Sequence, residues 1–295
     1  MTRESPRPTT LDETGAQGVR ALADAAAQAD GVAPLGEDFL LRLGTEEGTH
    51  LVSPVGPPFA GYAGIAPDGA AELVVHPDER GRGLGTELAR AVLDREPQAR
   101  LWAHGDLPAA QALAAGLGLT RVRELLVLRR PLAGVPDAPP PPEGFALRTF
   151  RPGQDEDALL AINAAAFAHH PEQGRLDRAG LAQRTEQAWF DPAGLFLVED
   201  ATGDLAAFHW TKVADPASGI GEVYVVGVSP QHQGHGLGGY VTAVGLAHLA
   251  GLGLSTVELY VEGDNAPALA TYASAGFGRH AVHSMYARAT ADALP

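Results

Sequence analysis

The sequence lacks cysteine altogether, and it contains neither a long apolar run nor many basic side chains. Without cysteine, disulfide bonds, thiolate catalysis and cysteine-ligated metal sites are excluded. No apolar run approaches the roughly 20 residues that a membrane-spanning helix needs. The polar start "MTRESPRPTTLDETG" has no apolar segment of the kind found in secretory signals. We therefore expect a cytoplasmic protein without a metal cofactor.

Acidic residues outnumber basic ones by 36 to 21, which gives a formal net charge of −15. Nucleic acids and anionic membranes bind to basic surfaces, so we expect neither of them as a partner. An anionic ligand would have to be held locally, by backbone N–H groups or by a helix N-terminus. The length of 295 residues predicts two domains of ordinary size. We expect the chain to act as a monomer.

A proline-rich segment, "PLAGVPDAPPPPEG" at residues 131–144, divides the chain. Its four consecutive prolines fit neither a helix nor a central strand. Near the start of each half lies a candidate amphipathic helix, "LDETGAQGVRALADAAAQADGV" in the first and "GQDEDALLAINAAAFAHHP" in the second. We predict an N-terminal domain at residues 1–137, a linker at 138–144 and a C-terminal domain at 145–295.

The two halves repeat one motif. "LVVHPDERGRGLGTELARAVL" (Leu73–Leu93) aligns with "VGVSPQHQGHGLGGYVTAVGL" (Val226–Leu246) at a constant offset of 153 residues, so that Pro77 falls on Pro230. Further on, "AAGLGL" resembles "SAGFGR", and each is followed by a candidate terminal strand, "RELLVLRR" or "HSMYARA". Two matches in the same order indicate an internal duplication of one domain.

The repeated glycine turn has three interpretations. A tight strand-to-helix connection would explain one copy, but it does not explain the same Gly-x-Gly-Leu-Gly core twice. A dinucleotide fingerprint fits Gly234–Gly239 formally, but five residues separate the strand from its first glycine, and the first copy breaks the pattern. The third is a pyrophosphate loop Q/R-x-x-G-x-G/A, which both copies satisfy, as Gln233–Gly238 and Arg80–Gly85. In this loop the sequence resembles the GNAT superfamily of N-acetyltransferases, whose coenzyme A pyrophosphate suits N–H groups at a helix N-terminus.

This resemblance implies an α/β fold with a mixed sheet in each of two tandem GNAT domains. The run before the second loop, "VYVVGV", predicts a buried strand, in which Gly227 favours a bulge or a close backbone approach. In the superfamily the equivalent strand parts from its neighbour, and its backbone binds the pantetheine arm. The resemblance therefore implies acetyl-coenzyme A contacts at Val226–Val228.

Acetyl transfer to an amine needs a base for the amine and a proton for the leaving thiolate. Glu222, at the head of this strand, is the predicted general base, although an exposed strand-end carboxylate is the alternative. Asn265-Ala-Pro267 predicts a helix start. Tyr272 then lies two turns into that helix, where the resemblance implies the coenzyme A sulfur and hence a general acid; a core tyrosine is the alternative. The first half has Gly69 in place of Glu222 and no counterpart of Tyr272, so we expect catalysis in the second half.

More of the chain resembles one family within this superfamily, the two-domain mycothiol synthases. The stretches that carry this resemblance include "DGVAPLGE", "WAHG", "AFAHHPEQG", "FHWTKV", "GEVYVVGV" and "LYVEGDNAPALATY", and they cover nearly the whole length. The resemblance implies transfer of acetyl from acetyl-coenzyme A to the cysteinyl amine of 1D-myo-inositol 2-(L-cysteinylamino)-2-deoxy-α-D-glucopyranoside, a small thiol-sugar. The implied substrate contacts are Glu37, Glu172, Lys212, Glu222 and Tyr260.

The resemblance also implies the residues that hold acetyl-coenzyme A in each half. In the C-terminal half they are Val226, Gly227, Val228, Gln233, Gly234, His235, Gly236, Leu237, Gly238, Gly239, Asn265, Ala266, Pro267, Ala268, Leu269 and Ala270. In the N-terminal half they are Leu73, Val74, Val75, Arg80, Gly81, Arg82, Gly83, Leu84, Gly85 and Thr86. Two other interpretations stay open: a GNAT enzyme that acts on a protein N-terminus or an aminoglycoside, and an acyl-coenzyme A sensor without catalysis.

Overall fold

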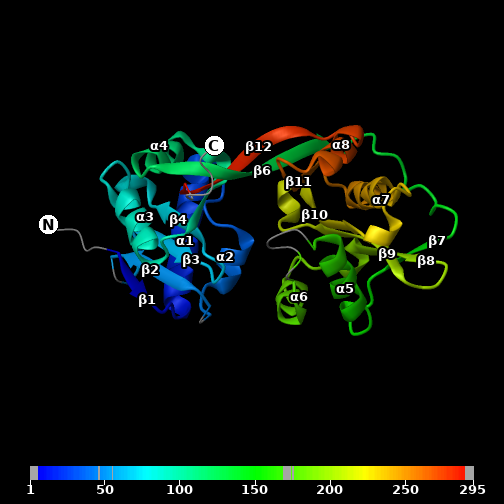
Figure 1. The fold of residues 1–295 in the computed structure, drawn as a ribbon, viewed down its shortest axis with the longest axis horizontal. Helices are drawn as coiled ribbons and strands as arrows, with labels where there is room; N and C mark the ends of the chain where they lie inside the picture. The colour runs from blue at the N-terminus through cyan, green and yellow to red at the C-terminus, as the bar shows by residue number, and fades with distance from the viewer. Residues whose placement is uncertain (1–5, 46, 55, 169–173, 175, 290–295) are drawn as a thin grey trace. The chain divides into compact units, whose positions relative to one another are not determined.

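The computed structural model describes residues 6–45, 47–54, 56–168, 174 and 176–289. They form two compact units (Figure 1): one runs up to Leu125 and resumes at Ala281, and the other runs from Leu126 to His280. The changes from one unit to the other fall inside two long strands, β6 (Leu119–Pro131) and β12 (Gly278–Arg288). A strand continues through each change, and the irregular segment 132–144 lies within the second unit.

The first unit is built on a mixed sheet in the order β1-β2-β3-β4-β5, with the last part of β12 beside β5. The strands from β1 to β4 are antiparallel neighbours, and β4 and β5 are parallel. Three helices cover the sheet, α1 (Glu13–Asp30), α3 (Leu84–Arg95) and α4 (Pro108–Gly116), and a short α2 (Glu37–Arg42) follows α1. The strands are β1 (Arg7–Thr9), β2 (Thr49–Ser53), β3 (Gly61–Ile65), β4 (Ala70–Val75) and β5 (Arg100–Ala103).

Alternating side chains of these strands fill two cores, because successive residues of a strand point to opposite faces. Leu51 and Ala63 pack into the core formed with α3 and α4, whereas Val52 and Tyr62 pack into the core formed with α1. The predicted first helix is confirmed as α1. It starts after Asp12, whose carboxylate accepts a hydrogen bond from the Gly15 amide, and it ends at a left-handed Gly31.

The second unit repeats this plan, with the strand order β11-β10-β9-β8-β7 and the end of β6 beside β11. Helix α7 (Leu237–Gly251) packs on one face, and α5 (Glu156–Ala166) and α6 (Arg178–Thr185) pack on the other, with Leu197 and Trp210 in the core beneath α5 and α6. The strands are β7 (Phe145–Thr149), β8 (Leu195–Asp200), β9 (Leu205–Lys212), β10 (Ile220–Val228) and β11 (Thr256–Glu262), and α8 (Ala266–Ser274) follows β11.

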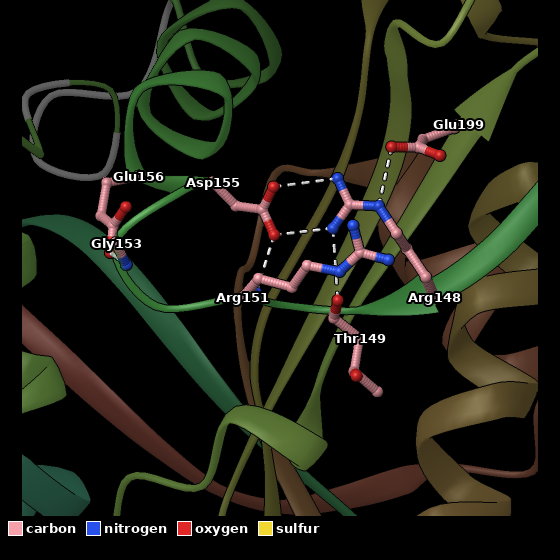
Figure 2. A network of polar contacts seen from close by, with 7 residues as sticks. All are labelled: Arg148, Thr149, Arg151, Gly153, Asp155, Glu156 and Glu199. Atoms are coloured by element: carbon pink, nitrogen blue, oxygen red, sulfur yellow. Dashed lines mark hydrogen bonds and ion pairs between the residues drawn. The ribbon is translucent and has the colours of Figure 1, made fainter.

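A polar network joins the edge strand β7 to its neighbours in the second unit (Figure 2). The Arg148 guanidinium donates to both carboxylate oxygens of Asp155 (2.6 and 3.0 Å) and to Glu199 (2.7 Å). Burial by itself would raise the pKa of Asp155, but the hydrogen bonds from Arg148 and from the Arg151 amide outweigh burial and lower it. This network fixes the start of α5 against the sheet.

Several predicted elements are confirmed. "VYVVGV" lies in β10, "RELLVLRR" lies in β6, and "HSMYARA" lies largely in β12. The predicted second helix is α5, shorter than the sequence pattern, and Asn265 caps the start of α8. Among the described residues, no helix combines the length and the apolar character that crossing a membrane requires.

His209 on β9 makes the stability of the fold depend on pH. Its side chain is fully buried, its Nδ1–H donates to the Val241 carbonyl (2.7 Å), and burial lowers its pKa to about 4. An unfolded histidine titrates near pH 6.5, so the unfolded chain takes up the proton first as pH falls. The stabilisation is therefore complete above about pH 6.5 and is lost as pH falls toward the folded pKa.

We expect the free energy of unfolding to fall by about 2 kcal/mol through His209 between pH 7.5 and pH 5.0. Chemical denaturation at both pH values measures this loss, which His209→Gln should reduce. The exposed His280, replaced in the same way, serves as the control, since it should leave the loss unchanged. Equal losses in wild type and His209→Gln would contradict this origin of the pH dependence.

Candidate active site

The centre of the candidate site is the point where β10 leaves β11. These parallel strands pair only from Ile220–Val223 to Thr256–Leu259, whereas β10 itself continues to Val228. Within the described part of the chain, β10 continues beyond Val223 with a ladder on one side alone, along β9. The backbone groups of Val226–Val228 that face away from β9 thus have no strand partner, and buried backbone groups of this kind need one. The predicted parting of the strands is present.

The same strand contains a bulge, but not at the predicted residue. The register between β10 and β9 shifts between Val223 and Val225, which places the bulge at Tyr224. Gly227 lies in regular register opposite Phe208, and a Cβ on Gly227 would come within 2.3 Å of the Phe208 ring. Glycine is therefore needed at position 227 because the Phe208 side chain lies close to its backbone. The alternative of a bulge at Gly227 is wrong.

The two glycine loops have the same backbone conformation. In each, a 3₁₀ turn, η1 (Pro77–Glu79) or η6 (Pro230–His232), leads into two left-handed glycines, Gly81 and Gly83 or Gly234 and Gly236. The second glycine of each pair precedes the helix, α3 or α7, and no side chain caps either N-terminus. The first N–H groups of both helices are therefore available to an anionic ligand.

The space over these helix ends suits a pyrophosphate. A Cβ placed on any of the four left-handed loop glycines would meet no atom within 4 Å, so the glycines are not required by packing inside the protein. Their positive φ and the open space above them are what a closely approaching ligand needs. The first turn of α7 carries no acidic residue, which also favours an anion there, whereas α3 has Glu87 in its first turn.

The side chains of the two loops are less available than the backbone amides to bind an anionic ligand. In the first loop, Arg80 forms a bidentate ion pair with Asp30 (2.6 and 2.8 Å), and Arg82 pairs with Glu79. In the second loop, His235 Nδ1 lies 3.2 Å from backbone carbonyls of its own turn. An acidic protein can therefore hold a polyanion here chiefly through its backbone.

A cavity of about 470 Å³ lies in the first unit, beside the parting of β4 and β5. Nine of the ten residues predicted to hold the cofactor in this half line it, all except Arg82. Its wall also includes Trp102 and His104 of the β5 end and Tyr286 of β12. The Tyr286 hydroxyl donates to Asp106 (2.7 Å). Tyr286 was not predicted to belong to this site, because β12 was assigned wholly to the second half. Trp102 and His104 were given no role there, although they lie in the quoted stretch "WAHG".

The first unit also has buried titratable groups beside this cavity. Glu72 on β4 accepts from the Gly36 amide (2.7 Å) and lies 2.8 Å from His104 Nε2, and His104 Nδ1 lies 2.5 Å from His283 Nδ1. Burial, and after it the neighbouring His104, lowers the pKa of His283 to about 4. These groups differ in type and position from Glu222 and Tyr272, so the two units are not chemically equivalent.

In the second unit, Glu222 lies opposite Lys212 across the β10–β9 ladder, and Lys212 Nζ is 4.0 Å from the Glu222 carboxylate. Both side chains are mostly covered, at 20% and 11% exposure. The ammonium of Lys212 also lies over two aromatic rings, 4.8 Å from the centroid of Trp189 and 4.9 Å from that of Tyr224. Lys212 and Glu222 were predicted from the sequence, but neither aromatic residue was.

Tyr272 lies on α8, as predicted, and belongs to the same hydrophobic cluster as Val226, Ala268 and Leu269. Burial raises the pKa of Tyr272 to about 12, so its hydroxyl keeps its proton throughout the physiological pH range. Three predicted cofactor contacts and the predicted acid are therefore gathered in one cluster. Asn265 uses its side-chain oxygen to accept from the Ala268 amide (3.1 Å).

The remaining predicted substrate contacts are spread over the chain. Tyr260 is 43% exposed on β11, two residues before the strand ends. Glu37 is the first residue of α2 in the first unit. Glu172 lies outside the described residues. In the described part of the chain, no cluster of three or more histidine, aspartate or glutamate side chains could hold a metal ion.

Comparisons with known proteins agree with this geometry. The sequence model of the acetyltransferase (GNAT) family matches residues 19–119 and 159–277. A tandem GNAT protein from the clavulanic acid biosynthesis pathway has the same fold, with a TM-score of 0.74 over 99% of this chain and 100% of its own, at 21% identity. A GCN5-related N-acetyltransferase from Sphaerobacter thermophilus aligns over 95% of this chain and 94% of its own, with a TM-score of 0.66 and 25% identity. The chain belongs to the acetyltransferase (GNAT) family, in two tandem copies, and is an acyltransferase.

Curated relatives narrow the resemblance further. A mycothiol acetyltransferase from Tsukamurella paurometabola is 53% identical over 91% of this chain and 94% of its own length. A mycothiol acetyltransferase from Streptomyces avermitilis is 50% identical over 92% and 91%. The resemblance to the mycothiol synthases predicted from the sequence is thereby confirmed.

Gly236 allows a direct test of the second loop. Alanine at its φ of 75° would be strained by about 1–2 kcal/mol, and its Cβ would enter the space above α7. We expect Gly236→Ala to raise the KM for acetyl-coenzyme A about tenfold in a coenzyme A release assay. Gly203→Ala is the matched control, because Gly203 has a φ of 90° and equally open surroundings in the β8–β9 turn. A similar rise in both variants would contradict a ligand at the loop.

Proposed function

We propose that this protein is an N-acetyltransferase that moves acetyl from acetyl-coenzyme A to the cysteinyl amine of 1D-myo-inositol 2-(L-cysteinylamino)-2-deoxy-α-D-glucopyranoside, the last step of mycothiol biosynthesis. The names of the relatives, at 45–53% identity, support this acceptor. The parting of β10 from β11 beside an uncapped helix supports acyl transfer from coenzyme A, and this is the observation that carries the proposal. A cytoplasmic location and a monomeric state are further expectations.

In the proposed reaction the second unit binds acetyl-coenzyme A and carries the two groups that transfer protons. Acetyl-coenzyme A supplies the acetyl group as a thioester. The N–H groups of Gln233–Gly239 hold its pyrophosphate, the free backbone edge of Val226–Val228 holds its pantetheine arm, and Asn265–Ala270 line the other side. The parting of β10 from β11 supports this arrangement, because Val226–Val228 lie on the parted end of β10, Gln233–Gly239 follow that strand and Asn265–Ala270 follow β11.

Two side chains would move the protons. Glu222 accepts the proton of the amine, directly or through a water molecule, and the Tyr272 hydroxyl donates a proton to the departing thiolate. An α-amino group titrates near roughly pH 7.7–8.0, so a single carboxylate suffices to complete its deprotonation. The raised pKa of Tyr272 supports its part, because the residue carries a proton to donate at neutral pH. Glu37, Glu172, Lys212 and Tyr260 are the further proposed contacts to the acceptor.

The N-terminal domain, proposed at residues 1–137, would bind a second coenzyme A without catalysis. Its cavity, lined by Leu73–Val75 and most of Arg80–Thr86, supports binding. The presence of Gly69 where the second half has Glu222 supports the absence of amine acetylation there. The proposed catalytic domain is residues 145–295, after the linker at 138–144.

A coenzyme A release assay with three acceptors tests the function. Purified protein is given acetyl-coenzyme A with the cysteinyl glucosaminyl-inositol amine, with a peptide that has a free N-terminus, or with an aminoglycoside. We expect fast turnover with the first acceptor alone. Turnover only with the others would overturn the acceptor, and binding of coenzyme A without turnover would favour a sensor.

Replacing the proposed base should impair chemistry and leave cofactor binding intact. We expect Glu222→Gln to lower kcat about a hundredfold or more, with little change in the KM for acetyl-coenzyme A, because general bases contribute about 10²–10⁴ to rate. The control is Glu258→Gln, since Glu258 lies directly opposite Glu222 on β11 but pairs with Arg129. Equal loss of cofactor affinity and turnover in Glu222→Gln would indicate a structural role.

Phenylalanine in place of Tyr272, the proposed acid, distinguishes the role of the hydroxyl from the role of the ring. Tyr272 packs edge-on against Phe277, with 5.7 Å between ring centroids, and phenylalanine preserves that contact. We therefore expect Tyr272→Phe to unfold at nearly the wild-type temperature but to turn over about a hundredfold more slowly. Thermal unfolding and steady-state kinetics of the same sample check both points. Wild-type turnover in this variant would show that Tyr272 is a core residue only.

A further inference from the structure

Lys212 has unusual surroundings for a lysine. It is the only lysine among the 21 lysine and arginine residues of the sequence, so every other cation is an arginine. Its side chain is 11% exposed, although it ends in a strongly hydrated ammonium group. An ammonium in such a place needs compensation from partners that the fold supplies. Part of this compensation is the Glu222 carboxylate, 4.0 Å away.

Two aromatic rings that form a corner supply further compensation. The Lys212 ammonium lies 4.8 Å from the centroid of Trp189 and 4.9 Å from that of Tyr224, both within the range in which a ring face attracts a cation. The two rings pack on each other edge-on, with their centroids 5.1 Å apart. The lysine stem is flexible, so its contacts with both rings and with the carboxylate restrict where the ammonium lies.

Each of the two rings is itself held in place by a specific local feature. Tyr224 is the bulged residue of β10, and its hydroxyl accepts a hydrogen bond from Arg184 Nε (2.9 Å). Arg184 in turn donates to the Gly180 carbonyl within α6 (3.0 Å). Trp189 follows α6 and also packs on Trp210 of β9. The bulge and the end of α6 therefore both serve to place these rings around one ammonium.

We propose that Trp189 and Tyr224 are positioning residues, which hold the Lys212 ammonium beside the Glu222 carboxylate and so shape the binding site of the acceptor amine. This inference rests on the proposed function, in which Lys212 and Glu222 meet the acceptor. It predicts that loss of a ring acts through Lys212 on the acceptor and leaves the cofactor site unaffected.

Steady-state kinetics of Trp189→Leu test whether loss of the ring affects the acceptor and leaves the cofactor site unaffected. We expect the KM for the cysteinyl glucosaminyl-inositol amine to rise about tenfold, with the KM for acetyl-coenzyme A unchanged within about twofold, and Trp189→Phe to restore most of the affinity. Phe190→Leu is the matched control, because Phe190 is half-buried in the same aromatic cluster and contacts Trp210 and Phe150. The same rise in Phe190→Leu would overturn the proposal.

A double-variant cycle shows whether the ring acts through Lys212. In a Lys212→Met background, Trp189→Leu should cause no further rise in the KM for the acceptor, because the cation that it positions is gone. A full additional tenfold rise would overturn the proposal and assign Trp189 a structural or direct role.

Because the chain has one lysine, its chemical reactivity gives a readout that needs no acceptor. Reductive methylation with formaldehyde, followed by mass analysis of the Lys212 peptide, should proceed several-fold faster in Trp189→Leu and in Tyr224→Leu than in wild type. Phe190→Leu should match wild type. Unchanged labelling in both ring variants would overturn the inference, whereas failure of wild type to use the acceptor, with labelling as expected, would overturn only the proposed acceptor.

Discussion

The parting of two parallel strands is the constraint from which the rest of the site follows. β10 pairs with β11 as far as Val223 and then continues with β9 alone. A backbone edge left open inside a sheet is unfavourable unless another molecule satisfies its hydrogen bonds. We propose that the open edge binds an extended, amide-bearing ligand such as the pantetheine arm. The glycine loop and the start of α7 lie at the end of the same strand, where the pyrophosphate of that ligand would come.

The same scaffold occurs twice with different polar groups. Both units have a strand that parts from its neighbour, two left-handed glycines and a helix without a side-chain cap. The second unit has Glu222 beside the mostly buried Lys212, whereas the first unit has the buried Glu72, which pairs with His104. We propose that binding of coenzyme A depends on backbone shape and that the chemistry depends on a few side chains. A duplicated domain can therefore keep the first property and lose the second.

Much of this was predictable from the sequence, because it depends on local patterns. The two loops at a constant offset, the helix start at Asn265 and the strand of "VYVVGV" all rest on turn and strand preferences of neighbouring residues. The bulge at Tyr224 was not predictable, because it depends on the register with β9. The contribution of β12 to the first unit was also missed, since its pairing with β5 joins residues far apart in sequence, such as Tyr286 and Leu101.

Side-chain surroundings were the least predictable part. No motif assigns a role to the side chains of Trp189, Arg184 and Tyr224, and only the fold brings them together around Lys212. Likewise, Gly227 indicated either a bulge or a close backbone approach, and only the position of the Phe208 ring, which a Cβ would meet, decides against the bulge. In both cases the deciding contact comes from a neighbouring strand or a helix end, which a single sequence does not specify.

We propose that both glycine loops bind coenzyme A and that the second unit alone transfers acetyl. A single-turnover experiment tests it most directly. Protein loaded with acetyl-coenzyme A labelled in its acetyl group, and freed of excess cofactor, is mixed with the cysteinyl glucosaminyl-inositol amine and quenched over time. The account predicts about two bound labels per chain, of which one is transferred in a fast phase while the other stays on coenzyme A. Fast transfer of both labels, or binding of a single label, would contradict it.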